Sequence, residues 1–173
     1  MIAALTVRAA TLADIPAMAE VHVRCWHETY AGLIPNEHLG RRTVAYRTAQ
    51  WNEALRDRDQ VVFVACESSG DIVGFASGGP SSEPVEGFDA ELGALYVLAA
   101  AHHRGAGRQL VHAIGGELKS RGFHAAWVRV LTENPAVEFY KKTGAEFICD
   151  VEEDIDGCMY REQFYGWRDV AAM

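Results

Sequence analysis

The feature that most constrains the fold is an apolar strand that runs directly into two glycines and then into an amphipathic helix. Residues 92–98 are apolar at both alternating positions, which is typical of a central strand covered on both faces. Gly105 and Gly107 follow, and a helix then carries Leu110, Ile114 and Leu118 on one face. Residues 125–131 form the next apolar run, so the sequence predicts a strand–helix–strand crossover at the centre of a sheet.

The remaining elements surround this crossover. Helical spacing of apolar residues predicts helices over residues 13–30, 43–55 and 135–142. β-rich runs predict strands over residues 5–8, 61–65, 72–76, 145–151 and 159–167, the last two joined by a turn at Asp156 and Gly157. The Gly-, Ser- and Pro-rich residues 77–87 are interpreted as a loop between two strands. We therefore expect one α/β domain over residues 1–173, with a mixed, mostly antiparallel sheet flanked by helices.

Charge and composition narrow the range of partners. The chain has 173 residues, of which 16 are basic and 24 acidic, and its formal net charge is −8. A chain of this kind lacks the basic surface that neutralises phosphates, so we expect no nucleic-acid partner. No apolar run reaches the ~20 residues that span a bilayer, and residues 1–8 lack a secretion signal. We expect a cytoplasmic protein without a membrane partner, whose four scattered cysteines are free thiols.

The two glycines suggest an anion site at the head of the helix. Glycine lets the backbone approach a ligand, and a helix start offers unpaired N–H donors and a positive dipole end. Arg104 and Arg108 can add charge-assisted contacts to a phosphate or pyrophosphate. Three interpretations compete: a P-loop, a dinucleotide site and an acyl-CoA site. The first lacks a Lys-Ser/Thr pair after the glycines, and the second lacks its third glycine, because Leu110 stands there.

The surrounding residues favour the third interpretation. Residues 91–147 resemble the core of the GNAT N-acetyltransferase superfamily, from its fourth strand to its sixth. Gly105 and Gly107 match the two small positions of the family's R/Q-x-x-G-x-G/A pattern, while His102 stands at the leading Arg/Gln position. The later N-x-x-A-x-x-F-Y-x-x-x-G-F pattern is similar to the segment that contains Asn134, Phe139, Tyr140, Gly144 and Phe147, with Ala145 and Glu146 inserted. Residues 26–35 also resemble the first-helix segment of one broad bacterial subgroup.

The resemblance implies an acetyl-CoA site in a sheet that splays between its central strands. The backbone of Leu95, Tyr96 and Val97 is expected to pair with the pantetheine arm. The pyrophosphate is expected to bind backbone N–H groups of the loop and helix start, formed by His103, Arg104, Gly105, Ala106, Gly107 and Arg108. Asn134 is expected near the pantetheine and Tyr140 near the sulfur, with the thioester between the splayed strands.

The chemistry of acetyl transfer assigns further roles. The reaction passes through a tetrahedral oxyanion, which a strand N–H near Val97 can stabilise. The Tyr140 phenol is suited to protonate the leaving thiolate; the alternative is that its ring only packs the short helix onto the sheet. The acceptor must be a neutral amine, so a base is needed. Glu91, the only carboxylate on the predicted central strand, is the first choice and Glu28 the second; each has the alternative role of a surface charge.

Acceptor recognition is assigned to the first helix and the loop after it. Trp26, Glu28 and Tyr30 are the candidates, because aromatic rings near a cleft bind cationic or apolar groups. The alternative for Trp26 is a place in the core. The histidines of the glycine loop and its helix, at positions 102, 103 and 112, are expected to contact solvent or the anion, and no metal is expected.

These observations favour an N-acetyltransferase that moves acetyl from acetyl-CoA directly to a primary amine of a small molecule, an amino-acid derivative or a peptide N-terminus. The alternative is a non-catalytic acyl-CoA-binding regulatory module. The presence of Tyr140 favours the enzyme, because a protein that only binds acyl-CoA needs no proton donor there. A toxin that acetylates charged tRNA is disfavoured by the net charge of −8. We expect a monomer or a homodimer, the latter pairing through residues 159–167 with their aromatic Phe164, Tyr165 and Trp167.

Overall fold

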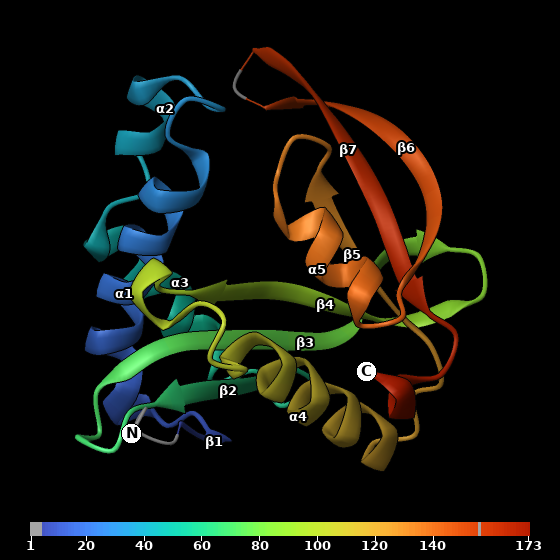
Figure 1. Cartoon of the computed structure of the whole chain (residues 1–173), viewed down its shortest axis with the longest axis horizontal. Coiled ribbons are helices and arrows are strands. Elements are labelled where there is room, and N and C mark those ends of the chain that lie inside the picture. Colours follow the sequence, from blue (N-terminus) through green and yellow to red (C-terminus); the bar gives the residue numbers. More distant parts are fainter. Residues whose placement is uncertain (1–4, 156) are drawn as a thin grey trace.

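Within residues 5–155 and 157–173, which the computed structural model describes, seven strands form one sheet (Figure 1). The strand order across the sheet is β1-β2-β3-β4-β5-β7-β6, and neighbouring strands are antiparallel except β4 and β5. The strands are β1 (Thr6–Ala9), β2 (Val61–Cys66), β3 (Ile72–Val85), β4 (Phe88–Val97), β5 (Ala126–Leu131), β6 (Glu146–Ile155) and β7 (Cys158–Trp167).

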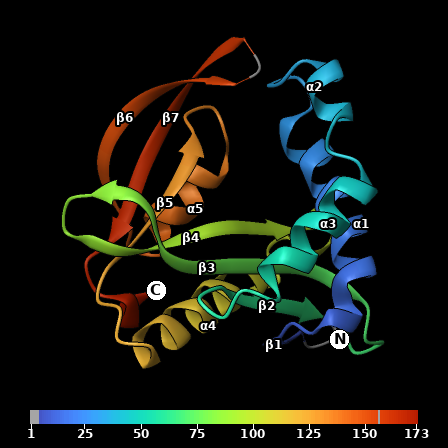
Figure 2. The same ribbon diagram turned by 180° about the vertical axis from the view of Figure 1, so that it is seen from behind.

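Helices cover both faces of this sheet (Figures 1 and 2). The two faces separate along β2: Val61 and Ala65 pack in the cluster that includes α4, whereas Val62 and Val64 pack with α1 and α3. The core therefore has two layers, one on each side of the sheet. The helices are α1 (Ile15–Tyr30), α2 (Asn36–Gly40), α3 (Val44–Ala54), α4 (Ala106–Ser120) and α5 (Ala136–Lys142), with short 3-10 turns η1 (Leu12–Asp14), η2 (Ala99–Ala101) and η3 (Val170–Ala172).

The crossover predicted from the sequence is β4–α4–β5. The ladder between the two parallel strands pairs Ala90 with Ala126 and Glu91 with Trp127, and in the described part of the chain it stops there. Beyond these residues the strands diverge: β4 runs toward α1, and β5 runs toward the far end of the β6–β7 hairpin (Figure 1). We call the region where β4 and β5 no longer pair the splay. The mixed, mostly antiparallel sheet that opens at its centre is thus confirmed.

Three details of the sequence prediction were wrong. Residues 77–87 do not form a loop: most of them continue β3, whose pairing with β4 shifts register after Ser77 and again between Pro80 and Val85. Strand β4 begins at Phe88, so Asp89 is a second carboxylate on it and Glu91 is not alone. Helix α2 was not predicted, because five residues are too few to show helical periodicity.

The composition of residues 77–87 has a packing cause. A Cβ on Gly78 would lie 2.9 Å from Cγ2 of Ile114, so glycine here lets α4 approach the sheet closely. Pairing of β2 with β3 ends at Gly78, so Pro80 lies beyond it and its missing N–H removes no bond to β2. Residues that usually mark a turn therefore serve a strand in this protein.

The aromatic residues of β7 belong to the chain's own core. Phe164, Tyr165 and Trp167 are 5%, 3% and 2% exposed. Phe164 stacks on Trp127 with ring centroids 4.6 Å apart, and Nε1 of Trp167 donates to the carbonyl oxygen of Thr143 at 3.1 Å. The expectation of a homodimer through residues 159–167 therefore loses its support from these side chains. All four cysteines are free thiols, as expected.

Candidate active site

The loop before α4 has the backbone geometry of an anion cradle. Gly105 immediately precedes the helix and has a left-handed conformation with φ of 86°, and His103 has φ of 60°. These conformations turn the chain so that α4 begins at Ala106. The first N–H groups of a helix have no acceptor within the helix, and the dipole makes this end positive. The cradle therefore suits a phosphate or pyrophosphate.

The arginines around this cradle differ in their surroundings. Nη1 of Arg104 donates to Oε1 of Glu67 at 2.5 Å, which ties the loop to the end of β2. The side chain of Arg108, in the first turn of α4, is exposed. Of the two arginines, Arg108 is thus placed to reach a ligand, while Arg104 holds the loop in position.

Gly107 serves the packing of two helices. A Cβ at this position would lie 3.2 Å from Cζ and 3.3 Å from Cε2 of Phe139, which is on α5. The sequence-based reason for Gly107 was close approach of the backbone to a ligand. In the structure, the position that a side chain of residue 107 would take is next to the ring of Phe139. Glycine is therefore needed here for the contact between α4 and α5.

The edge of β4 that borders the splay has backbone groups that point away from β3. An extended ligand can pair with a strand only if the strand's N–H and C=O groups point toward it. The N–H of Leu98 donates to the carbonyl oxygen of Val73 at 2.9 Å. Since backbone groups alternate in direction along an antiparallel strand, Val97 and Leu95 direct their N–H groups away from β3, toward the side from which β5 has diverged. The carbonyl oxygen of Val97 points the same way, and Nε2 of His102 lies 2.8 Å from it.

Three tyrosines from different elements meet beside this edge. Tyr30 ends α1, Tyr96 lies on β4 and Tyr140 on α5. Burial raises the pKa of each phenol, and the charge of Tyr30 acts on both Tyr96 and Tyr140. Tyr96 and Asn134 are hydrogen-bonding neighbours of Tyr30, and they lower its pKa against the larger effect of burial. The structure therefore brings together three residues that the sequence named separately: Tyr30, Asn134 and Tyr140.

Trp26 lies at the same end of α1 and is partly buried. Its ring is 4.4 Å from that of Tyr30, and the guanidinium of Arg47 on α3 lies 5.2 Å from it. Trp26 and Tyr30 also pack against a small core cluster that includes Leu131, at the end of β5. The two aromatic residues expected to recognise the acceptor thus lie next to the splay.

The two carboxylates considered as bases have different positions. Glu28 is engaged: Oε2 accepts from the N–H of Ala99 at 2.9 Å and Oε1 from Nε of Arg24 at 3.0 Å. Glu91 is the last residue of β4 that pairs with β5. Its Oε2 accepts from the N–H and the hydroxyl of Ser82, at 3.0 and 2.5 Å. Its Oε1 lies beside Gly93, 3.8 Å from where a Cβ would stand, so it points along β4 toward the splay.

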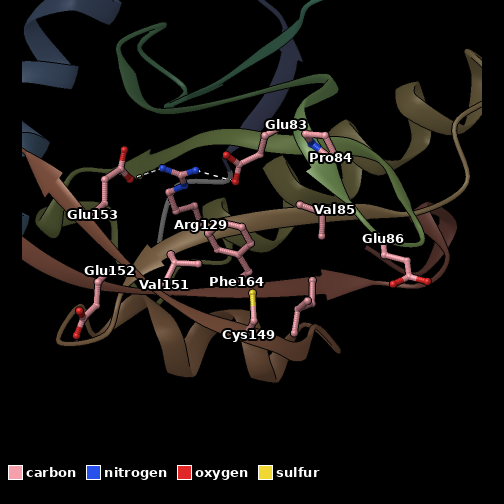
Figure 3. Close-up of a pocket in the computed structure, with 11 residues that line it drawn as sticks. Glu83, Pro84, Val85, Glu86, Arg129, Cys149, Val151, Glu152, Glu153 and Phe164 are labelled. Carbon is pink, nitrogen blue, oxygen red and sulfur yellow. Dashed lines mark hydrogen bonds and ion pairs between the residues drawn. The ribbon is translucent and has the colours of Figure 1, made fainter.

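A hollow of about 580 Å³ lies between the end of β3 and the β6–β7 hairpin (Figure 3). Arg129 of β5 stands at its edge and forms ion pairs with Glu83 of β3, at 2.8 Å, and with Glu153 of β6. The pairing of Leu131 with Glu162 puts the Glu162 side chain on the same face of the sheet as Arg129. Three glutamates therefore surround one arginine on this face.

Glu162 is buried, and its Oε2 lies 3.5 Å from Nη1 of Arg129 without a hydrogen-bond partner among the described residues. Burial, aided by the neighbouring carboxyl of Glu153, raises the pKa of Glu162 to about 7, although Arg129 opposes the shift. The charge of Glu162 also acts on Tyr30. It is an ionisable group near the splay that the sequence analysis missed.

Arg47 is a second ionisable residue near the site that was not predicted from the sequence. The sequence position of each of these two residues, Glu162 and Arg47, indicates weakly that its side chain is buried. Arg47 precedes Trp51 by four positions and so shares the buried face of α3. Glu162 lies two positions from both Tyr160 and Phe164 on β7. Residues two apart on a strand share a face, so Glu162 lies on the same inward face as these two aromatic residues.

Comparisons with known proteins agree with this geometry. The profile of the acetyltransferase (GNAT) family matches residues 16–145. The chain is 37% identical over 171 residues to the uncharacterized N-acetyltransferase YuaI of Bacillus subtilis (strain 168), covering 98% of this chain and 96% of that protein. The structure of YncA from Salmonella typhimurium with its cofactor acetyl-CoA aligns with a TM-score of 0.73 at 25% identity, covering 95% and 94% of the two chains. A ribosomal-protein-alanine N-acetyltransferase from Brucella melitensis aligns with a TM-score of 0.71 at 29% identity, covering 94% and 99%.

The fold, the cradle and these matches together define an acyltransferase. The chain belongs to the acetyltransferase (GNAT) family and is an N-acetyltransferase, as its sequence indicated.

Two further observations concern membranes and metals. No helix among the described residues has the length and apolar character to cross a bilayer. The described residues also contain no group of three or more His, Cys, Asp or Glu side chains arranged to hold a metal ion. Two histidines considered earlier have backbone contacts: His102 with Val97, and Nδ1 of His112 with the carbonyl oxygen of Met173 at 3.2 Å.

Proposed function

We propose that this enzyme moves an acetyl group from acetyl-CoA directly to a primary amine within a ternary complex. The observation that carries the proposal is the edge of β4 at Leu95 and Val97, whose backbone groups face the splay between the head of α4 and the buried phenol of Tyr140. The acceptor class is a small molecule, an amino-acid derivative or a peptide N-terminus. The bound acetyl-CoA in the similar structure of YncA supports the choice of donor.

The proposed acetyl-CoA site follows the order of the elements. The pantetheine arm pairs with the backbone groups of Leu95 and Val97, on either side of Tyr96, in the place that a continued β5 would occupy. The pyrophosphate accepts from the backbone N–H groups of residues 103–108, with Arg108 as a charged contact. Asn134 contributes its amide N–H₂, because its Oδ1 already accepts from the N–H of Ala136 at 2.9 Å.

In the proposed reaction the amine nitrogen attacks the thioester carbonyl carbon, and the C–S bond breaks as the new C–N bond is completed. The N–H of Val97 donates to the oxyanion that forms on the carbonyl oxygen. The hydroxyl of Tyr140 gives its proton to the leaving thiolate, and the phenolate takes up a proton from solvent before the next turnover. The phenol of Tyr140 carries its proton at neutral pH, and burial, which raises its pKa above the ordinary 10.0, keeps that proton in place until the charge on the leaving sulfur develops.

The proton lost by the amine goes, in this proposal, to Glu91, directly or through a water. Support comes from its place at the last rung of the β4–β5 ladder and from Oε1, which points toward the splay. Glu28 is less suited, since both of its oxygens accept hydrogen bonds that hold the start of η2 and Arg24. Trp26 and Tyr30 form the acceptor side, and Glu28 supports it by fixing the chain after β4.

Two measurements on the same protein test this function. Calorimetry measures acetyl-CoA binding, and a thiol assay measures CoA release with a panel of amines, amino acids and short peptides. Binding together with amine-dependent CoA release and an N-acetylated product is the expected result. Binding without CoA release for every amine would favour the non-catalytic acyl-CoA-binding module, and absence of binding would contradict both.

A further inference from the structure

Arg47 of α3 is a buried guanidinium on the acceptor side of the site. It is 6% exposed, and its Nη1 donates to Oε1 of Gln50 at 2.9 Å. Its Nε is buried without a hydrogen-bond partner. Among the residues that the structure describes, no carboxylate forms an ion pair with it, whereas the arginines at positions 8, 24, 104, 121 and 129 each have one.

The groups nearest Arg47 are aromatic or neutral, apart from the guanidinium of Arg42, whose like charge also acts on it. Its guanidinium carbon lies 5.2 Å from the centroid of the Trp26 ring and 5.5 Å from that of Tyr46. His22 is also close: burial, with the charge of Arg47 adding to it, lowers the pKa of His22 to about 3, so this imidazole is uncharged at neutral pH. Ring faces compensate part of the desolvation of a guanidinium, but they supply no counter-charge.

The unbalanced charge adjoins the place where the acceptor is proposed to lie. Arg47 acts electrostatically on the phenols of both Tyr30 and Tyr96, the pair beside the splay. Glu162 acts on Tyr30 with the opposite sign. A buried cation and a buried carboxyl group therefore both act on Tyr30, a combination that matches an acceptor bearing a carboxylate and an amine.

We propose that Arg47 binds a carboxylate of the acceptor, so that the acceptor is an amino acid or another amine that carries a carboxylate. This inference rests on the proposed function, since it assigns a substrate class to the same site. A guanidinium presents a planar set of donors that matches a carboxylate, and an anion would both pair the charge and supply an acceptor for Nε. The aromatic walls of Trp26 and Tyr30 then surround the part of the acceptor between its carboxylate and its amine.

A purely structural role for Arg47 makes a different prediction. If its stacking on Trp26 mainly held α1 and α3 together, then Arg47→Met would lower the thermal stability of the free enzyme. If Arg47 is a receptor for an anion, then Arg47→Met removes an uncompensated buried charge and keeps an unbranched apolar stem. The Tm of the free enzyme should then be unchanged within about 3 °C or higher.

The experiment compares each of the twenty L-amino acids, and a set of dipeptides, with its carboxamide, at saturating acetyl-CoA. We expect the wild-type enzyme to prefer one or more acids over the matching amides, and Arg47→Met to reduce that preference in kcat/KM by about 10²-fold, mainly through KM for the acid. Arg47→Lys should retain only part of it, because the planar fork is lost. Arg42→Met is the matched control: Arg42 stacks on Tyr46 at 4.9 Å but is not buried, and this variant should keep the wild-type preference.

The outcomes separate the inference from the proposed function. Acetylation of carboxamides or simple amines as efficiently as acids, or an Arg47→Met preference within about 3-fold of wild type, would overturn the role of Arg47 and leave acetyl transfer intact. If no amine releases CoA, the proposed function fails. In that case, calorimetry measures whether the same acids bind to the CoA-loaded enzyme, which tests Arg47 independently of acetyl transfer. Binding to the wild type that is lost in Arg47→Met supports the inference, and absence of binding to the wild type contradicts it.

Discussion

Nε2 of His102 lies 2.8 Å from the carbonyl oxygen of Val97. This contact ties the loop before α4 to the end of β4, the two segments proposed to bind the pyrophosphate and the pantetheine of one cofactor. His102 stands where the family pattern has Arg or Gln, and in this protein the imidazole acts on the backbone of the neighbouring strand. His102 is therefore one of the side chains that set the distance between the two parts of the site, together with Arg104 and Glu28.

The first prediction concerns this contact. His102→Ala should weaken acetyl-CoA binding about 2- to 10-fold, because one net hydrogen bond that orders the loop is lost. His102→Gln can still donate to the Val97 carbonyl and should bind acetyl-CoA nearly as the wild type does. Isothermal titration calorimetry measures both. Equal weakening by the two substitutions would show that this hydrogen bond does not organise the site.

Tyr140→Phe tests the proposed general acid, because it keeps the ring and removes only the hydroxyl. We expect kcat to fall about 10²- to 10⁴-fold while acetyl-CoA affinity changes less than about 2-fold. Tyr165→Phe is the control: Tyr165 is also buried, but its hydroxyl donates to Gln163 at 3.0 Å. Full kcat in Tyr140→Phe would remove the acid role and leave its ring as a packing element.

Glu91→Gln tests the base. The loss in kcat/KM should be greatest at the acidic end of the pH profile, where the acceptor amine is mostly protonated and help in removing its proton matters most. Glu162→Gln is measured alongside, since that carboxyl lies near Tyr30 and has an elevated pKa. If Glu91→Gln leaves the pH profile of kcat/KM unchanged and Glu162→Gln flattens it, then the base is Glu162 on β7 and not Glu91 on β4.

The raised pKa of Glu162 also predicts a pH-dependent stability. The carboxyl ionises near 4.5 in the unfolded chain and near 7 in the folded one, so between these values the folded state binds more protons. Stability therefore falls as the pH rises through this window. Glu162→Gln removes the effect, so its Tm relative to wild type should increase by a few degrees from pH 4.5 to 7.5. A constant difference across that range, measured by calorimetry, would mean that burial does not perturb this group.

Gly107→Ala should destabilise the fold by about 1–3 kcal/mol, because its Cβ would press on the ring of Phe139. The double variant Gly107→Ala, Phe139→Leu should recover most of this loss. Denaturant unfolding gives the stabilities, and calorimetry on the double variant shows what the residue does for acetyl-CoA. Failure of Phe139→Leu to restore stability would place the constraint on the backbone of Gly107.

The central crossover could be predicted because its signals are local: an apolar strand, two glycines and an amphipathic helix stand in direct succession. The cradle at Gly105 follows from the same run of sequence. Residues 77–87 were misinterpreted because glycine and other small residues are typical both of a turn and of a strand that a helix approaches closely. Only the contact of Gly78 with Ile114, which the sequence does not show, distinguishes the strand from a turn.

Arg47 and Glu162 show a different limit of sequence analysis. Hydrophobic periodicity treats a charged residue on a buried face as an interruption of the pattern, so it assigns such a residue no role. Both residues gain meaning only from neighbours distant in sequence: Arg47 from Trp26 on α1, and Glu162 from Arg129 on β5. A charge on an otherwise apolar face is therefore a useful sign of a site, provided that its spatial neighbours are known.

The short ladder between β4 and β5 has a mechanical consequence. Two residue pairs join a four-stranded leaf, β1 to β4, to a three-stranded leaf, β5, β7 and β6. A cofactor that pairs with the open edge of β4 would act as a temporary strand between the leaves, so amide exchange along this edge should slow when it binds. Release of CoA would then be a strand dissociation, repeated in every turnover, and the stiffness of the joint would set how fast the enzyme can begin the next cycle.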